Sequence, residues 1–228
     1  MGSWRTSSSA LTLLLLGGCA TTDREYSAVL DDFRHWTVES EQPAIVSLRR
    51  GVLDIDSPAG ITVWLNHEIQ GPVEIEFQAT AVSAGGPNDQ VSDLNVFWMA
   101  RNAGDPRPPF VKHRSGRFAE YDDLLTYYVG LGGNRNTTTR FRRYVGEPGN
   151  RPLLPEHDLS APRYLLVPNK PQTIRLVTNR HSIEYWRDGE QLFHLEDPAP
   201  YTAGWFALRT TWSHLRVRNL RIRHLRAD

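Results

Sequence analysis

Three observations predict an all-β protein. From residue 29 onward, short apolar or alternating runs are separated by glycine, proline and other turn residues, which is the pattern of strands joined by turns. No long stretch places apolar residues at helical spacing. The chain of 228 residues contains 7 Trp, 8 Tyr and 8 Phe, enough for one buried core, and no internal repeat or break in composition divides it. We therefore expect a single all-β domain over residues 29–228.

The first half of this domain is expected to contain strands rich in β-branched and aromatic residues. Glycine and proline punctuate these runs, so each run is short enough to be one strand. The expected strands are residues 45–48, 52–55, 62–65, 73–82 and 94–100.

The second half follows the same pattern and adds a hairpin signal. Asp188-Gly189 separates two alternating runs and supplies the two positive-φ positions of a type I′ turn. Residues 84–93, 101–123 and 146–162 are expected to be long loops, which are usually functional or mobile. The sequence leaves open whether 101–123 closes over a groove. The expected strands are residues 126–131, 137–145, 172–179, 182–187, 190–195, 204–209 and 214–223.

The first 28 residues carry an export signal. Residues 1–18 contain a basic start, a short apolar run and a small-residue end, and the run is too short to span a bilayer. The sequence Leu16-Gly17-Gly18-Cys19 resembles the bacterial lipoprotein signal, which implies removal of residues 1–18, a lipid on Cys19 and a linker over 19–28. Ala20 follows the Cys, with no Asp to suggest inner-membrane retention, which implies the outer membrane of a Gram-negative cell. A competing myristoylation pattern begins at Gly2, but the apolar run and the Cys favour export.

Charge is unevenly distributed along a chain whose formal net charge is zero. Residues 101–228 carry 21 Lys and Arg against 13 Asp and Glu, and 19 of those 21 basic residues are Arg. Guanidinium groups favour paired hydrogen bonds to planar anions such as carboxylate. The bias therefore indicates an anionic ligand, with the summed surface charge of scattered strands as the alternative. Nucleic acid is not expected as a partner, because the chain is exported and carries no recognised nucleic-acid motif.

Two segments carry a resemblance to known families. The hairpin at Asp188-Gly189-Glu190, followed by Gly204 to Ile222, resembles the closing strands of concanavalin A-like jelly rolls. The central segment, Tyr127 to Tyr144, resembles part of an uncharacterised bacterial jelly-roll family associated with polysaccharide degradation. The resemblance implies a concanavalin A-like β-sandwich of two antiparallel sheets that works on a polysaccharide or oligosaccharide, and contact with the membrane only through the lipid anchor.

The densest group of candidate functional residues lies in residues 130–144. Alternation along a strand places Arg140, Arg142 and Tyr144 on the face opposite Phe141, which is expected to point into the core. The alternative interpretation is a solvated arginine ladder. We expect catalytic roles for Tyr128, Arg140, Tyr144 and His157, with His113 as an alternative histidine, and substrate binding by Trp64, Asn95, Asn134, Asn136, Arg142 and Trp212.

These residue types suit the cleavage of an acidic, uronate-containing glycan by β-elimination. Arginine and amide groups would hold the uronate carboxylate, and tyrosine or histidine would move the protons. A tyrosine base needs a depressed pKa, which neighbouring arginines can provide. The alternatives are a non-catalytic glycan-binding lipoprotein and a glycoside hydrolase acting on a keto-sugar, the latter by resemblance to a related jelly-roll family.

Other chemistries lack their sequence signals. The glycines at 130, 132 and 133 are not followed by the Lys-Ser/Thr of a phosphate-binding loop, and Gly-x-Ser-x-Gly is absent. The histidines lack zinc-site spacing, so no metal site and no cofactor are expected. A structural calcium ion remains open, and its possible ligands are Asp54, Asp56, Asp93 and Asp188.

Overall fold

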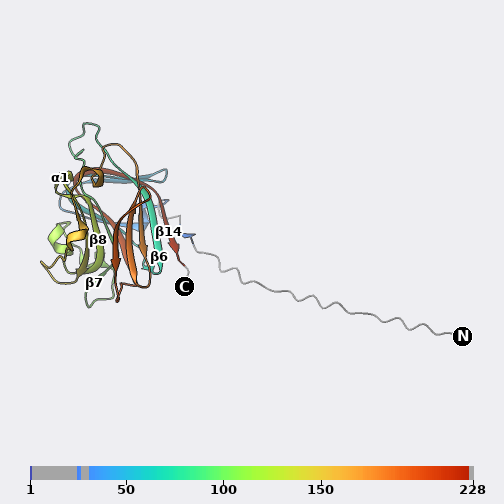
Figure 1. Ribbon diagram of the computed structural model, residues 1–228. Helices are drawn as coiled ribbons and strands as arrows, with labels where there is room; N and C mark the ends of the chain where they lie inside the picture. Colours follow the sequence, from blue (N-terminus) through green and yellow to red (C-terminus); the bar gives the residue numbers. More distant parts are fainter. Residues whose placement is uncertain (2–24, 27–30, 226–228) are drawn as a thin grey trace.

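The computed structural model describes residues 1, 25–26 and 31–225, and its regular elements are antiparallel strands together with a few helical turns of three or four residues. The strands form one continuous sheet that curls into two layers (Figure 1). The all-β jelly-roll prediction is therefore confirmed. Cys19 and the expected signal over 1–18 lie outside the described residues, as does the linker except for β1 (Glu25–Tyr26).

The first layer has the strand order β10-β9-β8-β7-β14-β4-β2. Its register is antiparallel throughout, as expected for strands joined by turns and loops. Two of its strands, β4 and β14, continue into the second layer. The bounds are β2 (Trp36–Ser40), β4 (Val52–Leu65), β7 (Leu94–Asn102), β8 (Leu124–Gly132), β9 (Thr138–Val145), β10 (Asp158–Leu159) and β14 (Ala203–His224).

The second layer has the order β3-β4-β14-β6-β11-β12-β13. The turn between β12 and β13 has φ of 50° at Asp188 and 82° at Gly189, which confirms the expected positive-φ hairpin. The short β5 pairs with the start of β14. The bounds are β3 (Ile45–Arg49), β5 (Ile69–Gln70), β6 (Val73–Ala81), β11 (Gln172–Thr178), β12 (Ser182–Arg187) and β13 (Glu190–Glu196).

Bends in β4 and β14 connect the two layers. The register of β14 against β4 shifts between Thr211 and Ser213, and Trp212 between them has φ of 47°. Such a bulge sharpens the bend of a strand without ending it. The sequence analysis divided each of these strands in two, because polar or small residues at the bend interrupt the apolar pattern. It also missed β2, β5 and β10, which are short or contain a buried charged residue.

The main core lies between the layers. Phe77 of β6 packs on Phe206 of β14 with ring centroids 5.9 Å apart, and Phe141 of β9 stacks on Phe193 of β13 at 5.8 Å. The indole of Trp98 donates a 3.1 Å hydrogen bond to Thr178 in the opposite layer. In the part of the chain that is described, no helix has the length and apolar character needed to cross a membrane.

Candidate functional site

The outer face of the first layer carries two parallel rows of register-paired residues. One row joins outward-facing positions of β9, β8, β7, β14, β4 and β2 that are paired in register. All of its residues are polar except one glycine. It reads Arg140, Gly130, Asn95, Arg209, Thr62 and Glu39. The adjacent row is largely aromatic and reads Arg142, Tyr128, Phe97, Ala207, Trp64 and Thr37.

Residues 101–123 cover one end of both rows, over β14, β4 and β2. This segment, here called the covering loop, contains η3 (Pro109–Lys112) and η4 (Phe118–Tyr121). Tyr121 packs on Trp64 and Phe97, with ring centroids 6.3 and 5.6 Å away. The result is a second apolar cluster, separate from the core between the layers.

A buried carboxylate fastens the covering loop to the sheet. One oxygen of Glu39 accepts hydrogen bonds from Trp64 Nε1 at 2.8 Å and from the Tyr121 hydroxyl at 2.9 Å, and the other accepts from the backbone N–H of Arg114 at 2.9 Å. The Gly116 carbonyl accepts a 2.8 Å bond from the buried guanidinium of Arg209. The loop that the sequence left undecided therefore closes over half of the sheet face.

The uncovered half of the face forms a pocket of about 230 Å³ over β7, β8 and β9. We call it the β8–β9 pocket. It brings together Tyr128, Asn134, Arg140 and Arg142 among the residues selected from the sequence. Its lining is Asp93, Phe118, Tyr128, Gly130, Gly133, Asn134, Thr138, Arg140, Arg142 and Arg151.

Gly130 opens the floor of the pocket. A Cβ atom there would lie 2.6 Å from the Tyr128 hydroxyl and 3.2 Å from Asn95 Oδ1, so only glycine lets these two polar atoms approach the backbone of β8 this closely. Asn95 is 3 % exposed and its Oδ1 has no hydrogen-bond partner among the described residues. The Tyr128 hydroxyl likewise has none within the described part of the chain. Buried polar atoms without partners are rare in folded proteins, and Asn95 Oδ1 is one that lies next to Gly130 of the pocket.

The three arginines that line the pocket differ in what neutralises them. Arg140 forms a two-point ion pair with Asp158 at 2.8 and 3.1 Å. Arg151 makes a single ion-pair contact with Asp122 at 2.6 Å. Arg142 donates to the Arg151 carbonyl and has no carboxylate partner among the described residues. Arg142 is thus the guanidinium in this pocket that is available to an anion.

Burial changes the acid–base properties of the pocket. It raises the pKa of Asp93, against the opposing effect of hydrogen bonds from Ser92 and Asn95. Burial also raises the pKa of Tyr128 well above its usual value. The sequence-based expectation of a tyrosine with a depressed pKa is therefore wrong for Tyr128, because desolvation exceeds the effect of the nearby arginines. Tyr128 is a neutral hydroxyl that can donate a hydrogen bond or a proton.

The two asparagines after β8 have a conformational role that their sequence context did not reveal. Asn134 and Asn136 have φ of 53° and 59°, as part of the left-handed turn α1 (Gly133–Asn136). Asparagine is among the residues that adopt this region most readily. Asn136 binds the backbone of Leu166 with both ends of its amide, at 2.9 and 3.0 Å, and does not line the pocket. Asn134 does line it.

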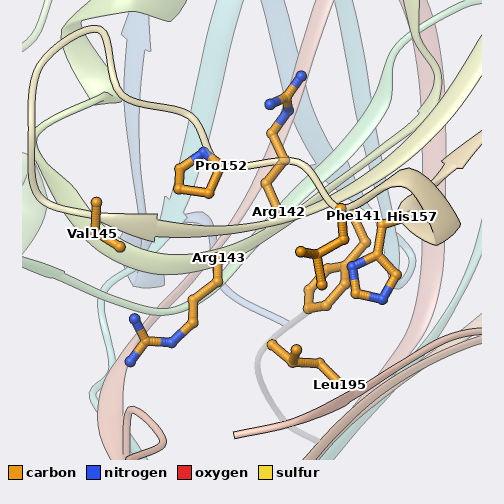
Figure 2. A pocket seen from close by; sticks show the side chains of 8 residues that line it. Phe141, Arg142, Arg143, Val145, Pro152, His157 and Leu195 are labelled. Atoms are coloured by element: carbon orange, nitrogen blue, oxygen red, sulfur yellow. The ribbon is translucent and has the colours of Figure 1, made fainter.

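His157, expected to be catalytic, lies in a different place. It packs edge-on against Phe141 with centroids 4.8 Å apart, and its Nε2 lies 3.1 Å from the His194 carbonyl. It lines an apolar pocket of about 210 Å³ near β13; Arg142 also lines this pocket, but Figure 2 shows its guanidinium extending away from His157. The alternating sides of β9 explain the separation, since Phe141 and Arg142 point to opposite faces. His113 is exposed and lines neither pocket.

The remaining aromatic residues expected at the site are not in the pocket. Trp64 and Tyr144 are each 0 % exposed within the second apolar cluster, so neither can contact a ligand from solvent. Trp212 is 42 % exposed but lies at the bend of β14, where its indole donates to the Pro87 carbonyl at 3.3 Å. Sequence alone could not separate these sites, because aromatic residues in strands face both the core and the surface.

The four aspartates considered for calcium do not form a site. Asp54 pairs with His214 and Arg216, Asp56 accepts from Asn88, and Asp188 accepts from the backbone N–H of Thr173 in β11. Asp93 lies in the β8–β9 pocket. Within the described residues, no group of three or more His, Cys, Asp or Glu side chains could hold a metal ion.

Solved structures with the same fold are known. A Bacillus subtilis protein of unknown function with a galectin-like fold superposes with a TM-score of 0.64 at 13 % identity, over 90 % of this chain and 96 % of that one. Carbohydrate-binding module CBM66 from Bacillus subtilis gives 0.54 at 10 % identity, over 82 % and 93 %. A provisionally assigned glycosyl hydrolase from Parabacteroides distasonis gives 0.53 at 12 % identity, over 89 % and 94 %. At these identities the likeness shows the fold alone.

Carbohydrate recognition domains are also among the structural neighbours, including those of Emp46p and Emp47p. The search of curated protein sequences found no match. A family model matches residues 55–220, a span that includes β6 to β13 and most of β4 and β14. The chain belongs to the family described as Domain of unknown function (DUF6250).

Proposed function

We propose that the β8–β9 pocket binds a carboxylated sugar unit of a glycan. The observation that carries the proposal is the guanidinium of Arg142, which lines the pocket and has no carboxylate partner among the described residues. An arginine without a counter-ion suits a sugar carboxylate. The Tyr128 hydroxyl, which lines the pocket, can donate a hydrogen bond to a sugar hydroxyl. The carbohydrate-binding module and recognition domains among the structural neighbours support the same ligand class.

The test is calorimetric titration of the purified protein with acidic and neutral sugars. The acidic probes are glucuronic and galacturonic acid and oligosaccharides of polygalacturonate, alginate and glucuronoxylan, and the neutral probes are the corresponding uncharged sugars. Binding of an acidic probe, with its neutral counterpart binding at least tenfold more weakly, is expected. Binding confined to neutral sugars would remove the role given to Arg142.

Two substitutions locate the binding. Arg142→Gln is expected to weaken binding of the acidic probe by about 10- to 100-fold, since a hydrogen bond to a charged group contributes about 1.5–3 kcal/mol. Arg135→Gln is the control, because Arg135 is an exposed cation on the neighbouring turn that does not line the pocket. Equal losses in both variants would indicate attraction by the general positive charge of this half of the protein.

Cleavage of the bound glycan by β-elimination is a second candidate, favoured by Asp93 and Tyr128 lining the pocket with Arg142. The ionised Asp93 carboxylate would take the proton α to the sugar carboxylate, which Arg142 holds. The electron pair would form the carbon–carbon double bond as the bond to the glycosidic oxygen breaks. The Tyr128 hydroxyl would protonate that oxygen, and proton return from Asp93 would restore both groups.

Elimination is tested by following unsaturated products by ultraviolet absorbance together with new reducing ends. A rise in both that is lost in Tyr128→Phe supports elimination. Reducing ends without unsaturated products would instead indicate hydrolysis, including hydrolysis of a keto-sugar glycoside. Binding with neither signal leaves a non-catalytic glycan-binding protein.

We also propose that Cys19 carries a lipid that tethers the protein to the outer membrane. The support is the sequence Leu16-Gly17-Gly18-Cys19 at the end of an apolar run. Mass spectrometry of the protein purified from membranes of a Gram-negative host should find lipid on an N-terminal Cys19. A Cys19→Ala variant should then move to the soluble fraction, and an unchanged distribution would contradict the proposal.

A further inference from the structure

The uncovered and covered halves of the first layer belong to what would otherwise be one long groove. The two residue rows continue from β9 to β2 without a break in register. An open face of this kind could hold several consecutive sugars. The covering loop interrupts it, because Phe118 packs on Tyr128 at 5.4 Å between centroids and so stands at the inner side of the pocket.

This inner wall is rigid. The Arg151 guanidinium lies 4.4 Å from the Phe118 ring centroid and is held by Asp122 at 2.6 Å. Asp122 is 3 % exposed and also accepts from the backbone N–H of Gly149 at 3.2 Å. Behind Phe118, Gly116 is packed so closely that a Cβ atom would lie 2.6 Å from the Glu41 nitrogen. A glycan chain therefore cannot continue from the pocket toward β14 without displacing the loop.

The side of the pocket formed by the α1 turn is also fixed. Asn136 ties the turn to Leu166 through two hydrogen bonds, and Asn134 Nδ2 donates to the Thr138 hydroxyl at 3.2 Å. With about 230 Å³ between these walls, the pocket is smaller than the roughly 300–1,000 Å³ of sites for drug-sized ligands. That space suits one sugar unit. The remaining exit passes over β9 and β10, where the half-exposed Arg140 already pairs with Asp158.

We infer that the β8–β9 pocket takes the terminal acidic sugar of a glycan chain and excludes internal segments. The inference rests on the proposed function, since it specifies which part of an acidic glycan binds there. The Phe118–Arg151 wall stops the chain on one side, and the rest of the glycan leaves over β9 into solvent. Units beyond the first would then add little to the affinity.

The experiment compares chain lengths of one acidic glycan. The probes are galacturonic acid, its α-1,4-linked oligomers of two to six units, and polygalacturonate, with the equivalent glucuronic acid and alginate series in parallel. The expected result is a dissociation constant per chain that changes less than about threefold beyond the disaccharide. At equal mass, shorter chains should bind more protein, and the free monosaccharide should displace the polymer completely.

Two outcomes overturn the inference while leaving the proposed function intact. One is an affinity per chain that rises tenfold or more from the disaccharide to the hexasaccharide. The other is an amount of protein bound per mass of glycan that does not depend on chain length. Absence of binding to every acidic probe instead removes the proposed function, and the inference with it. Arg142→Gln should reduce binding of the monosaccharide and the polymer by the same factor, whereas Arg135→Gln, on the exposed turn outside the pocket, should change either by less than about threefold.

Discussion

The two halves of the outer face of the first layer belong to the same sheet but differ in how their polar groups are held. In the covered half, Glu39 accepts three hydrogen bonds from the sheet and the covering loop, and Arg209 donates to Thr62 and Gly116 while its Nε has no partner among the described residues. The uncovered half contains groups without such partners among the described residues. Asn95 Oδ1 and the Tyr128 hydroxyl have no hydrogen-bond partner, and the Arg142 guanidinium has no carboxylate partner. Both halves belong to the same two residue rows, which run across the strands from β9 to β2.

The difference shows how one sheet face can serve both stability and recognition. A buried polar group that finds its partners within the chain stabilises one arrangement, whereas one left without partners makes its own burial unfavourable. Asn95 Oδ1 is such a group beside the half that solvent and ligands can reach, and Arg209 Nε is one under the covering loop. The covering loop buries one half and leaves the other open. Changes at its anchor should therefore affect stability, whereas changes in the pocket should affect binding.

The largest effect is expected from breaking the anchor of the covered half. Glu39→Ala leaves Trp64 Nε1, the Tyr121 hydroxyl and the Arg114 N–H without their acceptor under the loop. The free energy of unfolding should fall by about 3–5 kcal/mol, because each unsatisfied buried donor costs roughly 1–3 kcal/mol and relaxation recovers part of it. Urea denaturation of the purified protein measures the change.

The matched control for the anchor is Glu68→Ala, which removes an exposed carboxylate near β5. It should change the free energy of unfolding by less than about 0.5 kcal/mol. A similar loss in both variants would show that Glu39 has no special role. Tyr121→Phe removes one of the three donors. Its loss of unfolding free energy should lie between those of Glu39→Ala and Glu68→Ala, near 1 kcal/mol.

The next effect is expected from giving the open half a side chain. Gly130→Ala places a methyl group 2.6 Å from the Tyr128 hydroxyl and 3.2 Å from Asn95 Oδ1. The buried tyrosine must shift, so stability should fall by about 1 kcal/mol. Binding of the acidic probe should weaken by at least tenfold, as measured by calorimetry. Unchanged binding would place the ligand outside this pocket.

Much of the fold could be predicted from the sequence because local patterns determine it. The strands at 73–82, 94–100 and 126–131 and the Asp188-Gly189 hairpin depend on alternation and turn chemistry, and the structure contains them close to the expected bounds. The continuation of β4 and β14 through both layers was not predictable in this way. A bend is a tertiary feature, and the residues at it look like a loop.

The candidate site was predicted only in part, for a comparable reason. Alternation along β9 correctly placed Arg140 and Arg142 on the face opposite Phe141, which lies in the core. Asp93 was seen only as a possible calcium ligand, because its burial depends on the fold of two distant strands. Trp64 was expected at the ligand because nothing in its neighbours indicates that residues 101–123 cover it.

A smaller effect should come from removing the charge of Asp93. Because burial raises the pKa of this carboxyl, its ionisation destabilises the folded state. The penalty is absent below the pKa of the unfolded chain, grows as pH rises through the folded-state pKa, and is complete above it. Asp93→Asn should therefore raise the free energy of unfolding at pH 7 by about 1 kcal/mol relative to the native protein, and the gain should vanish at low pH.

Urea denaturation at a series of pH values measures this gain. The variant should at the same time lose any elimination activity, since Asn cannot accept the proton. A variant that is less stable than the native protein at pH 7 would mean that the hydrogen bonds from Ser92 and Asn95 outweigh burial.

The smallest effect is expected at Trp212, which tests whether the site is confined to the open half. Trp212 is the partly exposed tryptophan at the bend of β14, and its indole contacts Pro87 instead of the pocket. Trp212→Ala should change the affinity for the acidic probe by less than twofold in the calorimetric titration. A tenfold loss would extend the binding surface around the bend, and the walls that limit the β8–β9 pocket to a chain end would then not define the whole site.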